Sequence, residues 1–350
     1  MERGKWNLIT DVPGVKVGHV TLYEQEGDEC VCTGVTAILP HSRNLFEEKV
    51  TAAHFVLNGF GKTVGLVQVE ELGVIESPIM LTNTFSVGAV LEGTLQYMLD
   101  ENETIGDSTS SLNIVVGECN DSYLNSMRLM RVRPEHAIKA IQSAHSGPFT
   151  MGDVGAGKGM ICYDRKGGIG SSSRIVNNED VQYTVGVLAL TNFGRKEECK
   201  IDEWLRKNGL HASPASNIKE ADIDKPDGSV IIIVATDAPV NERQLKRLSK
   251  RAAIGLGRTG THVHNGSGDI MIAFSNSQNV LHSSDSAVRT MDCLRDDHPV
   301  MNSLFEAVIE ATEEAVYQSL LHAETVVGRK GRVIEKWPTI ADGAQFNSYV

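Results

Sequence analysis

Apolar residues recur along the chain at two spacings, one typical of strands and one typical of helices. Residues 8–39 combine short apolar runs with glycine-containing turns and are predicted to be rich in strands. Residues 229–235 form a continuous, largely β-branched run, which is typical of a strand buried on both faces. Residues 181–190 and 270–274 are also predicted as strands, and two further short apolar runs span 63–69 and 112–116.

Helical spacing of apolar residues predicts the remaining elements. It indicates a helix over 86–99 and an amphipathic helix over 241–254. Pro134 suits the first position of another helix, because proline lacks the N–H that a first helical turn leaves unbonded. The last long helix is predicted from about residue 304 to residue 322, with a capping-box pattern that begins at Ser303.

The order of these elements predicts one layered domain. Strands and helices are mixed without strict βαβ alternation, which favours an α+β architecture. No tandem repeat or flexible linker divides the sequence, so residues 1–350 are expected to form a single domain. Residues 196–227 are polar, with lysine and aspartate clusters, and are interpreted as an excursion from the core.

Composition and charge narrow the class of partner. The formal net charge of −12 disfavours nucleic acid and anionic membranes. No apolar run approaches the roughly 18 residues of a membrane span, and the protein is expected to be cytoplasmic. Cys30 and Cys32 form a close pair, but without a second pair they are predicted to be ordinary thiols rather than zinc ligands. We expect no metal and no cofactor.

The junction between Gly266 and Ser267 is the strongest candidate for chemistry. If this bond is cut, Ser267 gains an α-amine with a pKa of about 7.7–8, which can act as a base for its own hydroxyl. Taken alone, the stretch is more typical of a glycine-rich turn before a strand, and the rest of the chain reverses that preference. A triad of Ser267, His264 and Asp269 is a weaker alternative, because the spacing is not that of a nucleophile elbow.

A second glycine-rich segment, residues 152–159, is similar to a phosphate-binding loop. Gly159 stands where that loop needs a hydroxyl for magnesium, and no buried strand precedes the segment. We therefore favour a loop whose backbone approaches a site closely over a nucleotide-binding loop.

Two polar residues elsewhere in the chain are candidates for assisting the chemistry at Ser267. Asn192 ends a predicted strand, where its amide can donate to an oxyanion or simply cap a turn. Thr312 lies on the apolar stripe of the last helix, where a hydroxyl commonly bonds the carbonyl four residues back. The neighbouring glutamates are by themselves typical of a solvated helix face: Glu310, Glu313 and Glu314.

Several segments, taken together, resemble the DmpA-type aminopeptidases, also called L-aminopeptidase/D-amino-acid esterase-amidases, which include β-peptidyl aminopeptidases. The matching segments run in order over nearly the whole chain: 9–19, 33–37, 58–62, 155–160, 167–170, 235–239, 265–269 and 311–315. The resemblance implies an αββα sandwich similar to that of N-terminal-nucleophile hydrolases. It also implies a precursor that cleaves itself into an α chain, 1–266, and a β chain, 267–350, and a homo-oligomer, often a tetramer.

The resemblance further implies roles for individual residues. Ser267 is the implied nucleophile, first in self-cleavage and then in hydrolysis. Thr312 and Glu314 fall on the pair that supports the nucleophile in the family, and Tyr163 is expected to line the site. On a regular helix, residues two apart lie about 200° apart, so Thr312 and Glu314 share a target only if the helix is irregular or one of them acts indirectly.

The resemblance also bears on the residues that bind the oxyanion and the substrate ammonium group. Asn192 is the expected oxyanion-hole residue, with the region of Asp237 as the competing placement. Met151 stands where the family often has a glutamate for the substrate ammonium group, and Lys158 replaces a common threonine. We expect Asp153 to bind the substrate in place of that glutamate; the alternative is that the substrate itself differs from that of the family.

These observations predict a metal-independent hydrolase that removes N-terminal residues from small peptides, amides or esters through an acyl-enzyme on Ser267. Acyl transfer by the same nucleophile is the alternative enzyme class. An uncleaved, degenerate member that acts as a binding protein is the non-enzyme alternative, because Met151 and Lys158 depart from the family pattern.

Overall fold

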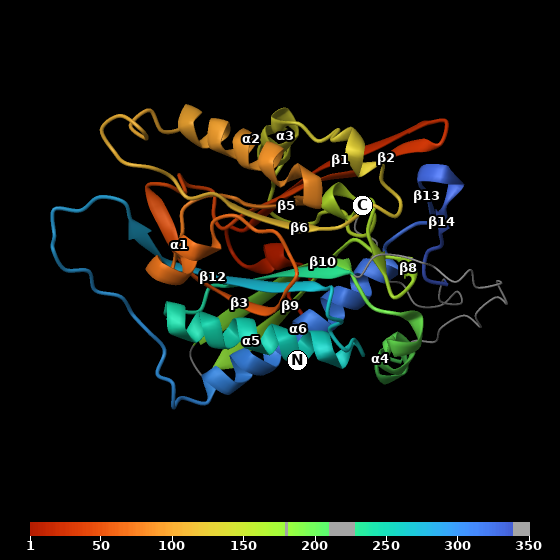
Figure 1. The fold of residues 1–350 in the computed structure, drawn as a ribbon. Coiled ribbons are helices and arrows are strands. Elements are labelled where there is room, and N and C mark those ends of the chain that lie inside the picture. The colour runs from red at the N-terminus through yellow and green to blue at the C-terminus, as the bar shows by residue number, and fades with distance from the viewer. Residues whose placement is uncertain (179–180, 210–227, 339–350) are drawn as a thin grey trace.

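Two β-sheets stack face to face, and a pair of helices covers the outer side of each sheet, in the computed structural model of the chain (Figure 1). The structure describes residues 1–178, 181–209 and 228–338. The order of layers is αββα, which confirms the predicted fold class.

The first sheet has four strands in the order β1-β2-β5-β6. A long antiparallel hairpin forms β1 and β2, as the strand-rich pattern of residues 8–39 predicts, whereas β5 and β6 pair in parallel. Helices α2 and α3 pack on its outer side (Figure 1). The bounds are β1 (Lys16–Glu26), β2 (Glu29–Leu39), β5 (Ile79–Asn83), β6 (Val115–Cys119), α2 (Val87–Asp100) and α3 (Pro134–Gln142).

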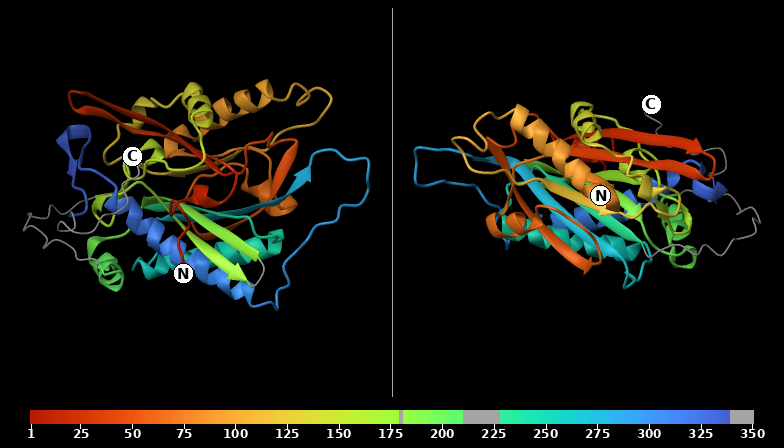
Figure 2. Two further views of the ribbon diagram at one scale, coloured as in Figure 1. Left: turned by 180° about the vertical axis from the view of Figure 1, so that it is seen from behind. Right: turned by 45° about the horizontal axis from the view of Figure 1, so that its top comes forward.

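The second sheet has six strands in the order β4-β3-β12-β11-β10-β9, and β11 and β12 are its parallel pair. Helices α5 and α6 cover its outer side, and the N-terminal segment runs beside β9 (Figure 2). The bounds are β3 (Glu48–Gly59), β4 (Val74–Ile75), β9 (Ile169–Asn178), β10 (Val181–Asn192), β11 (Ser229–Thr236), β12 (Gly268–Leu281), α5 (Glu242–Arg258) and α6 (Val300–Leu321).

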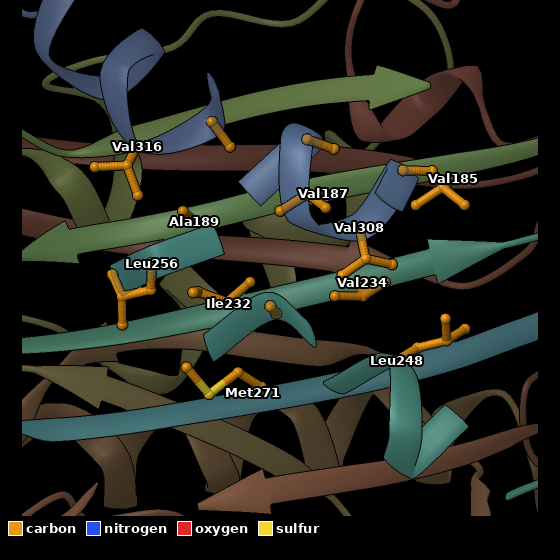
Figure 3. Packing of buried hydrophobic residues seen from close by; sticks show 14 of the residues in the cluster. Val185, Val187, Ala189, Ile232, Val234, Leu248, Leu256, Met271, Val308 and Val316 are labelled. Atoms are coloured by element: carbon orange, nitrogen blue, oxygen red, sulfur yellow. The ribbon is translucent and has the colours of Figure 1, made fainter. Parts of the chain in front are cut away.

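Two apolar cores meet at the second sheet. Ile232 and Val234 point to the helices, where they pack with residues of α5 and α6 such as Leu248 (Figure 3). Ile231 and Ile233 point to the other sheet. Every residue of β11 is buried, which confirms the prediction from its unbroken β-branched run.

Smaller elements connect the layers. They are α1 (Leu66–Leu72), α4 (Ile201–Lys207), β7 (Ile161–Cys162), β8 (Arg165–Lys166), β13 (Val326–Val327) and β14 (Val333–Ile334), with 3₁₀ turns at 9–11, 84–86, 127–129, 155–157, 196–198 and 329–331. The predicted polar excursion includes α4, and its residues 210–227 lie outside the described part of the chain.

The helices are close to their predicted positions, with one error at a boundary. Pro134 is the first residue of α3, and Asn241 caps α5 by accepting the Gln244 N–H. The capping box at Ser303 is wrong, because α6 begins at Val300 and Ser303 lies inside it. Val300 and Met301 are both buried, so core packing extends the helix beyond the local signal.

Candidate active site

Ser267 lies at one end of the second sheet, immediately before β12. The next residue, Gly268, pairs with Ser229 of β11 on one side and Gly59 of β3 on the other. The segment that leads from α5 turns sharply here, and the Ser267 N–H donates to the carbonyl of His264 at 2.9 Å. Ser267 is only 3% exposed, so the uncut chain closes over its hydroxyl.

Asp269 provides a carboxylate directly beside the hydroxyl. The Ser267 Oγ donates to Asp269 Oδ1 at 2.9 Å, while Asp269 Oδ2 has no hydrogen-bond partner among the described residues. Burial raises the pKa of Asp269 to about 6, although the bond from Ser267 and the proximity of His264 both lower it. A carboxylate with this pKa is ionised at neutral pH and can still accept a proton.

Asn58 fixes the backbone on both sides of the junction. Its Nδ2 donates to the carbonyl of Ser267 at 2.6 Å and to those of His264 and Asn265 at 3.0 and 3.1 Å. Asn58 pairs with Asp269 across the sheet, so β3 itself positions the amide. The motif that contains Asn58 is part of the family resemblance, but its sequence carries no signal for this contact.

His264 does not form a triad with Ser267. Its Nε2 contacts Glu198 Oε1 at 2.8 Å, and His262 lies 3.5 Å from the same oxygen. The Ser267 hydroxyl bonds to Asp269 instead. The structure therefore contradicts the Ser267–His264–Asp269 alternative.

Asn192 lies at the same end of the sheet as Ser267. It pairs with Ser229, which pairs in turn with Gly268. Its side chain accepts the Ile161 N–H at 2.9 Å and donates to the Asn120 carbonyl at 2.8 Å. An amide carries two N–H groups, so within the described part of the chain one hydrogen of Asn192 is left for an oxyanion.

The competing oxyanion position, the region of Asp237, lies at the other end of the sheet. Thr236 pairs with Ser275, seven residues along β12 from Gly268, or roughly 23 Å at the rise of a strand. Asp237 accepts the Thr184 N–H at 2.7 Å there. The structure therefore places the region of Asp237 away from Ser267. The sequence could not show this, because the pairing of distant strands decides which strand ends lie together.

Thr312 and Glu314 are not brought to the nucleophile. Glu314 is fully buried and paired with Arg174 at 2.7 Å and Arg3 at 2.8 Å. Arg174 pairs with Val185 in the row of the sheet that contains Ser275, far from Ser267. Burial alone would raise the pKa of Glu314, but Arg174 and Arg3 hold it below its usual value.

Thr312 is buried against α5, next to Gly255, and its hydroxyl has no hydrogen-bond partner among the described residues. The hydroxyl is thus not bonded to the carbonyl four residues back, and it does not contact Ser267. Neither Thr312 nor Glu314 thus contacts Ser267 in the uncut chain. Their spacing agrees with this, because residues two apart on a helix point in different directions.

The other two expected site residues make their polar contacts with residues other than Ser267. Tyr163 is fully buried, with its hydroxyl 2.6 Å from Thr259 Oγ1, so it belongs to the core and does not line an open site. Asp153 is paired with Lys158 at 2.7 Å and accepts the Glu324 N–H. Its carboxylate is therefore already paired with a cation of the protein itself, and its role in substrate binding stays a prediction.

The glycine-rich loop serves close packing. A Cβ atom at Gly34 of β2 would lie 2.4 Å from the carbonyl oxygen of Gly155, and one at Gly155 would lie 2.4 Å from Thr36 Oγ1. The loop continues as a three-residue 3₁₀ turn instead of the helix that a phosphate-binding loop precedes. Close backbone approach is thus its observed role.

Glu118 is a candidate site residue that the sequence analysis missed. It lies on β6 and is 2% exposed; Oε1 accepts the Lys62 N–H at 2.9 Å, and Oε2 bonds the Thr84 hydroxyl. The intervening Gly61 packs against the backbone of Gly268, and a Cβ at Gly61 would lie 4.0 Å from Oε1. The signal was present, because Glu118 interrupts an otherwise apolar strand.

The described residues contain no group of three or more histidine, cysteine or acidic side chains arranged to hold a metal ion. Among the helices of that part of the chain, none is both long enough and apolar enough to span a membrane.

Comparisons with known proteins identify the family of this chain. The model of Peptidase family S58 matches residues 7–334. Beta-peptidyl aminopeptidase BapA of Sphingosinicella microcystinivorans is 39% identical, over 96% of this chain and 86% of its own length.

Solved structures are similar over almost the same range. The PH0078 protein of Pyrococcus horikoshii OT3 is 48% identical with a TM-score of 0.86. The L-aminopeptidase D-Ala-esterase/amidase of Ochrobactrum anthropi, described as a prototype for the serine aminopeptidases and a new variant among the Ntn hydrolase fold, is 31% identical with a TM-score of 0.84. Each comparison covers 96% of this chain and 92% of the other. This chain therefore belongs to peptidase family S58 and is a hydrolase of the serine aminopeptidase type.

Proposed function

We propose that this chain is the precursor of a self-processing aminopeptidase that uses Ser267 twice. Ser267 first cuts the Gly266–Ser267 bond and then removes N-terminal residues from small peptides, amides or esters. The contact between the Ser267 hydroxyl and the Asp269 carboxylate carries the proposal, because it places a base on the nucleophile before any α-amine is free.

Self-cleavage proceeds by an N-to-O acyl shift. The Ser267 Oγ attacks the Gly266 carbonyl carbon while Asp269 takes the hydroxyl proton. The intermediate collapses with loss of the C–N bond, and Asp269 returns the proton to the departing nitrogen of Ser267. Water then hydrolyses the Gly266 ester, which frees a carboxylate at Gly266 and both the hydroxyl and the amine of Ser267.

Asn58 supports this step by holding the carbonyls that flank the bond. Fixing the two sides of the scissile peptide against one rigid strand lowers the entropy cost of bringing Oγ onto the carbonyl carbon. The residues from 259 to 266 remain attached to α5, so cleavage frees their end and opens the buried hydroxyl to substrate.

In the mature enzyme the Ser267 amine becomes the base for its own hydroxyl. Its expected pKa of about 7.7–8 leaves a usable neutral fraction at physiological pH. The free N–H of Asn192, together with backbone N–H groups, stabilises the oxyanion. Attack on the substrate carbonyl gives an acyl-enzyme and releases the amine, and water then releases the N-terminal residue.

Glu118 is the residue that we assign to the substrate ammonium group. It is a carboxylate separated from the backbone of Gly268 only by Gly61, and Lys62 and Thr84 leave acceptor capacity on both its oxygens. An N-terminal ammonium bound there would place the adjacent carbonyl near Ser267. With Glu118 in this role, the substrate ammonium group has a carboxylate partner even though Met151 stands where the family often has a glutamate. The similarity to a β-peptidyl aminopeptidase supports β-amino-acid as well as α-amino-acid substrates.

The intact mass under denaturing conditions tests the proposal, with Ser267→Ala measured in parallel. Two fragments that split between Gly266 and Ser267, and a single full-length mass for the variant, are expected. Aminoacyl amides should be hydrolysed by the processed protein, with activity retained after chelation of metals. A single full-length mass for both proteins would contradict self-cleavage by Ser267 and favour the uncleaved binding protein.

A further inference from the structure

We propose that Phe60 and Phe85 form an apolar platform that selects substrates with a large apolar side chain on the N-terminal residue. This inference rests on the proposed function, since it concerns the side chain next to the ammonium group that Glu118 holds. The two phenylalanines lie on the two segments that bind the two oxygens of Glu118.

Phe60 is attached to the nucleophile strand through its backbone. Its carbonyl oxygen lies 2.9 Å from the position of a Cβ at Gly268, the residue after Ser267. Two residues later, the Lys62 N–H binds Glu118 Oε1. Phe60 is nonetheless 62% exposed, an unusual state for a phenylalanine so close in the chain to buried residues.

Phe85 approaches the same carboxylate from the other side. It follows Thr84, whose hydroxyl binds Glu118 Oε2, and the Asn83 side chain accepts the Phe85 N–H at 3.0 Å. This bond closes the 3₁₀ turn before α2 and fixes the point from which the ring projects. The ring is 50% exposed.

Two exposed phenylalanines therefore lie within two residues, along the chain, of the two groups that bond the carboxylate proposed to bind the ammonium group. The side chain of an N-terminal amino acid branches within one or two bonds of its ammonium group, so it lies next to Glu118 when that group is bound. Burying an apolar side chain on aromatic rings is favourable, while glycine or alanine gains little. The Lys62 ammonium lies 4.9 Å above the Phe60 ring and repels a basic side chain at that place.

The test is the substrate profile of the processed enzyme. The kcat/KM values for the amides of phenylalanine, leucine, alanine, glycine and lysine are compared between the wild type, Phe60→Ala and Phe85→Ala. Each alanine variant is expected to lose about tenfold to a hundredfold on phenylalanine and leucine amides, with alanine and glycine amides changed less than about threefold. Phe60→Leu and Phe85→Leu retain apolar surface and should keep most of the preference.

Val67→Ala is the matched control, because Val67 is an apolar residue of α1 that is 88% exposed and outside the contacts of Glu118. It should leave the whole profile unchanged. All variants are first checked by mass for complete processing. Equal loss on every amide, or no loss on phenylalanine and leucine, would overturn the platform while the aminopeptidase function stands. A processed wild type inactive on every amide would overturn the proposed function and this inference together.

Discussion

At the scale of single residues, the proposed chemistry depends on a serine and a carboxylate two positions apart. Ser267 and Asp269 lie on one short stretch, yet the carboxylate acquires its properties from burial, which raises its pKa to about 6. In solvent an aspartate would be a much weaker base, with a pKa of about 3.9. Burial therefore converts a common surface residue into a proton acceptor suited to neutral pH.

We predict that self-cleavage requires the ionised form of Asp269. Because its pKa is raised to about 6, the base form predominates above that pH and its population falls below it. Cleavage of freshly translated wild-type chain should be about tenfold slower at pH 5 than at pH 7.5. Asp269→Asn should slow cleavage by about 10²-fold or more and remove the inflection.

A gel-based time course at several pH values measures both effects. Asp153→Asn is the control carboxylate, since Asp153 is paired with Lys158 and lies outside the contacts of Ser267. Cleavage of Asp269→Asn at the wild-type rate would show that another group takes the proton.

At the scale of elements, α6 is linked to β9 by ions as well as by apolar packing. Glu314 of α6 is fully buried and reaches Arg174 of β9, which also contacts Glu310 one helical turn earlier. Arg3 of the N-terminal segment contacts Glu314 at 2.8 Å. The resemblance gave Glu314 a role in supporting the nucleophile, whereas this ion-pair cluster gives it a structural role.

The two explanations predict different behaviour for Glu314→Gln. Removing the charge of Glu314 leaves the buried Arg174 with only the more exposed Glu310 as an ionic partner among the described residues, so we expect a loss of about 3 kcal/mol in the free energy of unfolding. The kcat of the folded, processed enzyme should change little. Chemical denaturation and steady-state kinetics on the same preparation measure both quantities. A large fall in kcat at unchanged stability would restore the catalytic role.

At the scale of the whole molecule, the proposed cleavage point lies at the end of a continuous sheet. β12 belongs to the expected β chain but is paired on both sides with strands of the expected α chain, β3 and β11. Helix α6, also in the β chain, packs on β9, β10 and α5. Cutting one peptide bond at the end of this sheet leaves all these contacts in place.

We therefore predict that the two chains stay together after processing. Size-exclusion chromatography with light scattering should give one species containing both fragments in equal amounts, and the fragments should separate only in denaturant. The same measurement determines the oligomeric state, for which we propose a homo-oligomer. Loss of the β chain on dilution would show that the shared sheet does not hold the fragments.

The sequence by itself determined the features that depend on nearby residues. Apolar spacing located α2, α5 and most of α6, and the unbroken β-branched run identified β11 as a strand buried on both faces. The Gly266–Ser267 junction was also visible locally, since a potential N-terminal nucleophile needs only one serine after one bond. The start of α6 was misplaced because tertiary packing of Val300, and not a capping residue, begins that helix.

Only the tertiary structure decided which distant residues surround the junction. Asn58 meets Ser267 across 209 positions of sequence because β3 pairs with β12, and Asn192 rather than Asp237 shares its end of the sheet because of strand register. Glu118 enters from the other sheet, through the stacking of two layers. Strand pairing and sheet stacking depend on the fit of whole surfaces, so no local pattern encodes these partners.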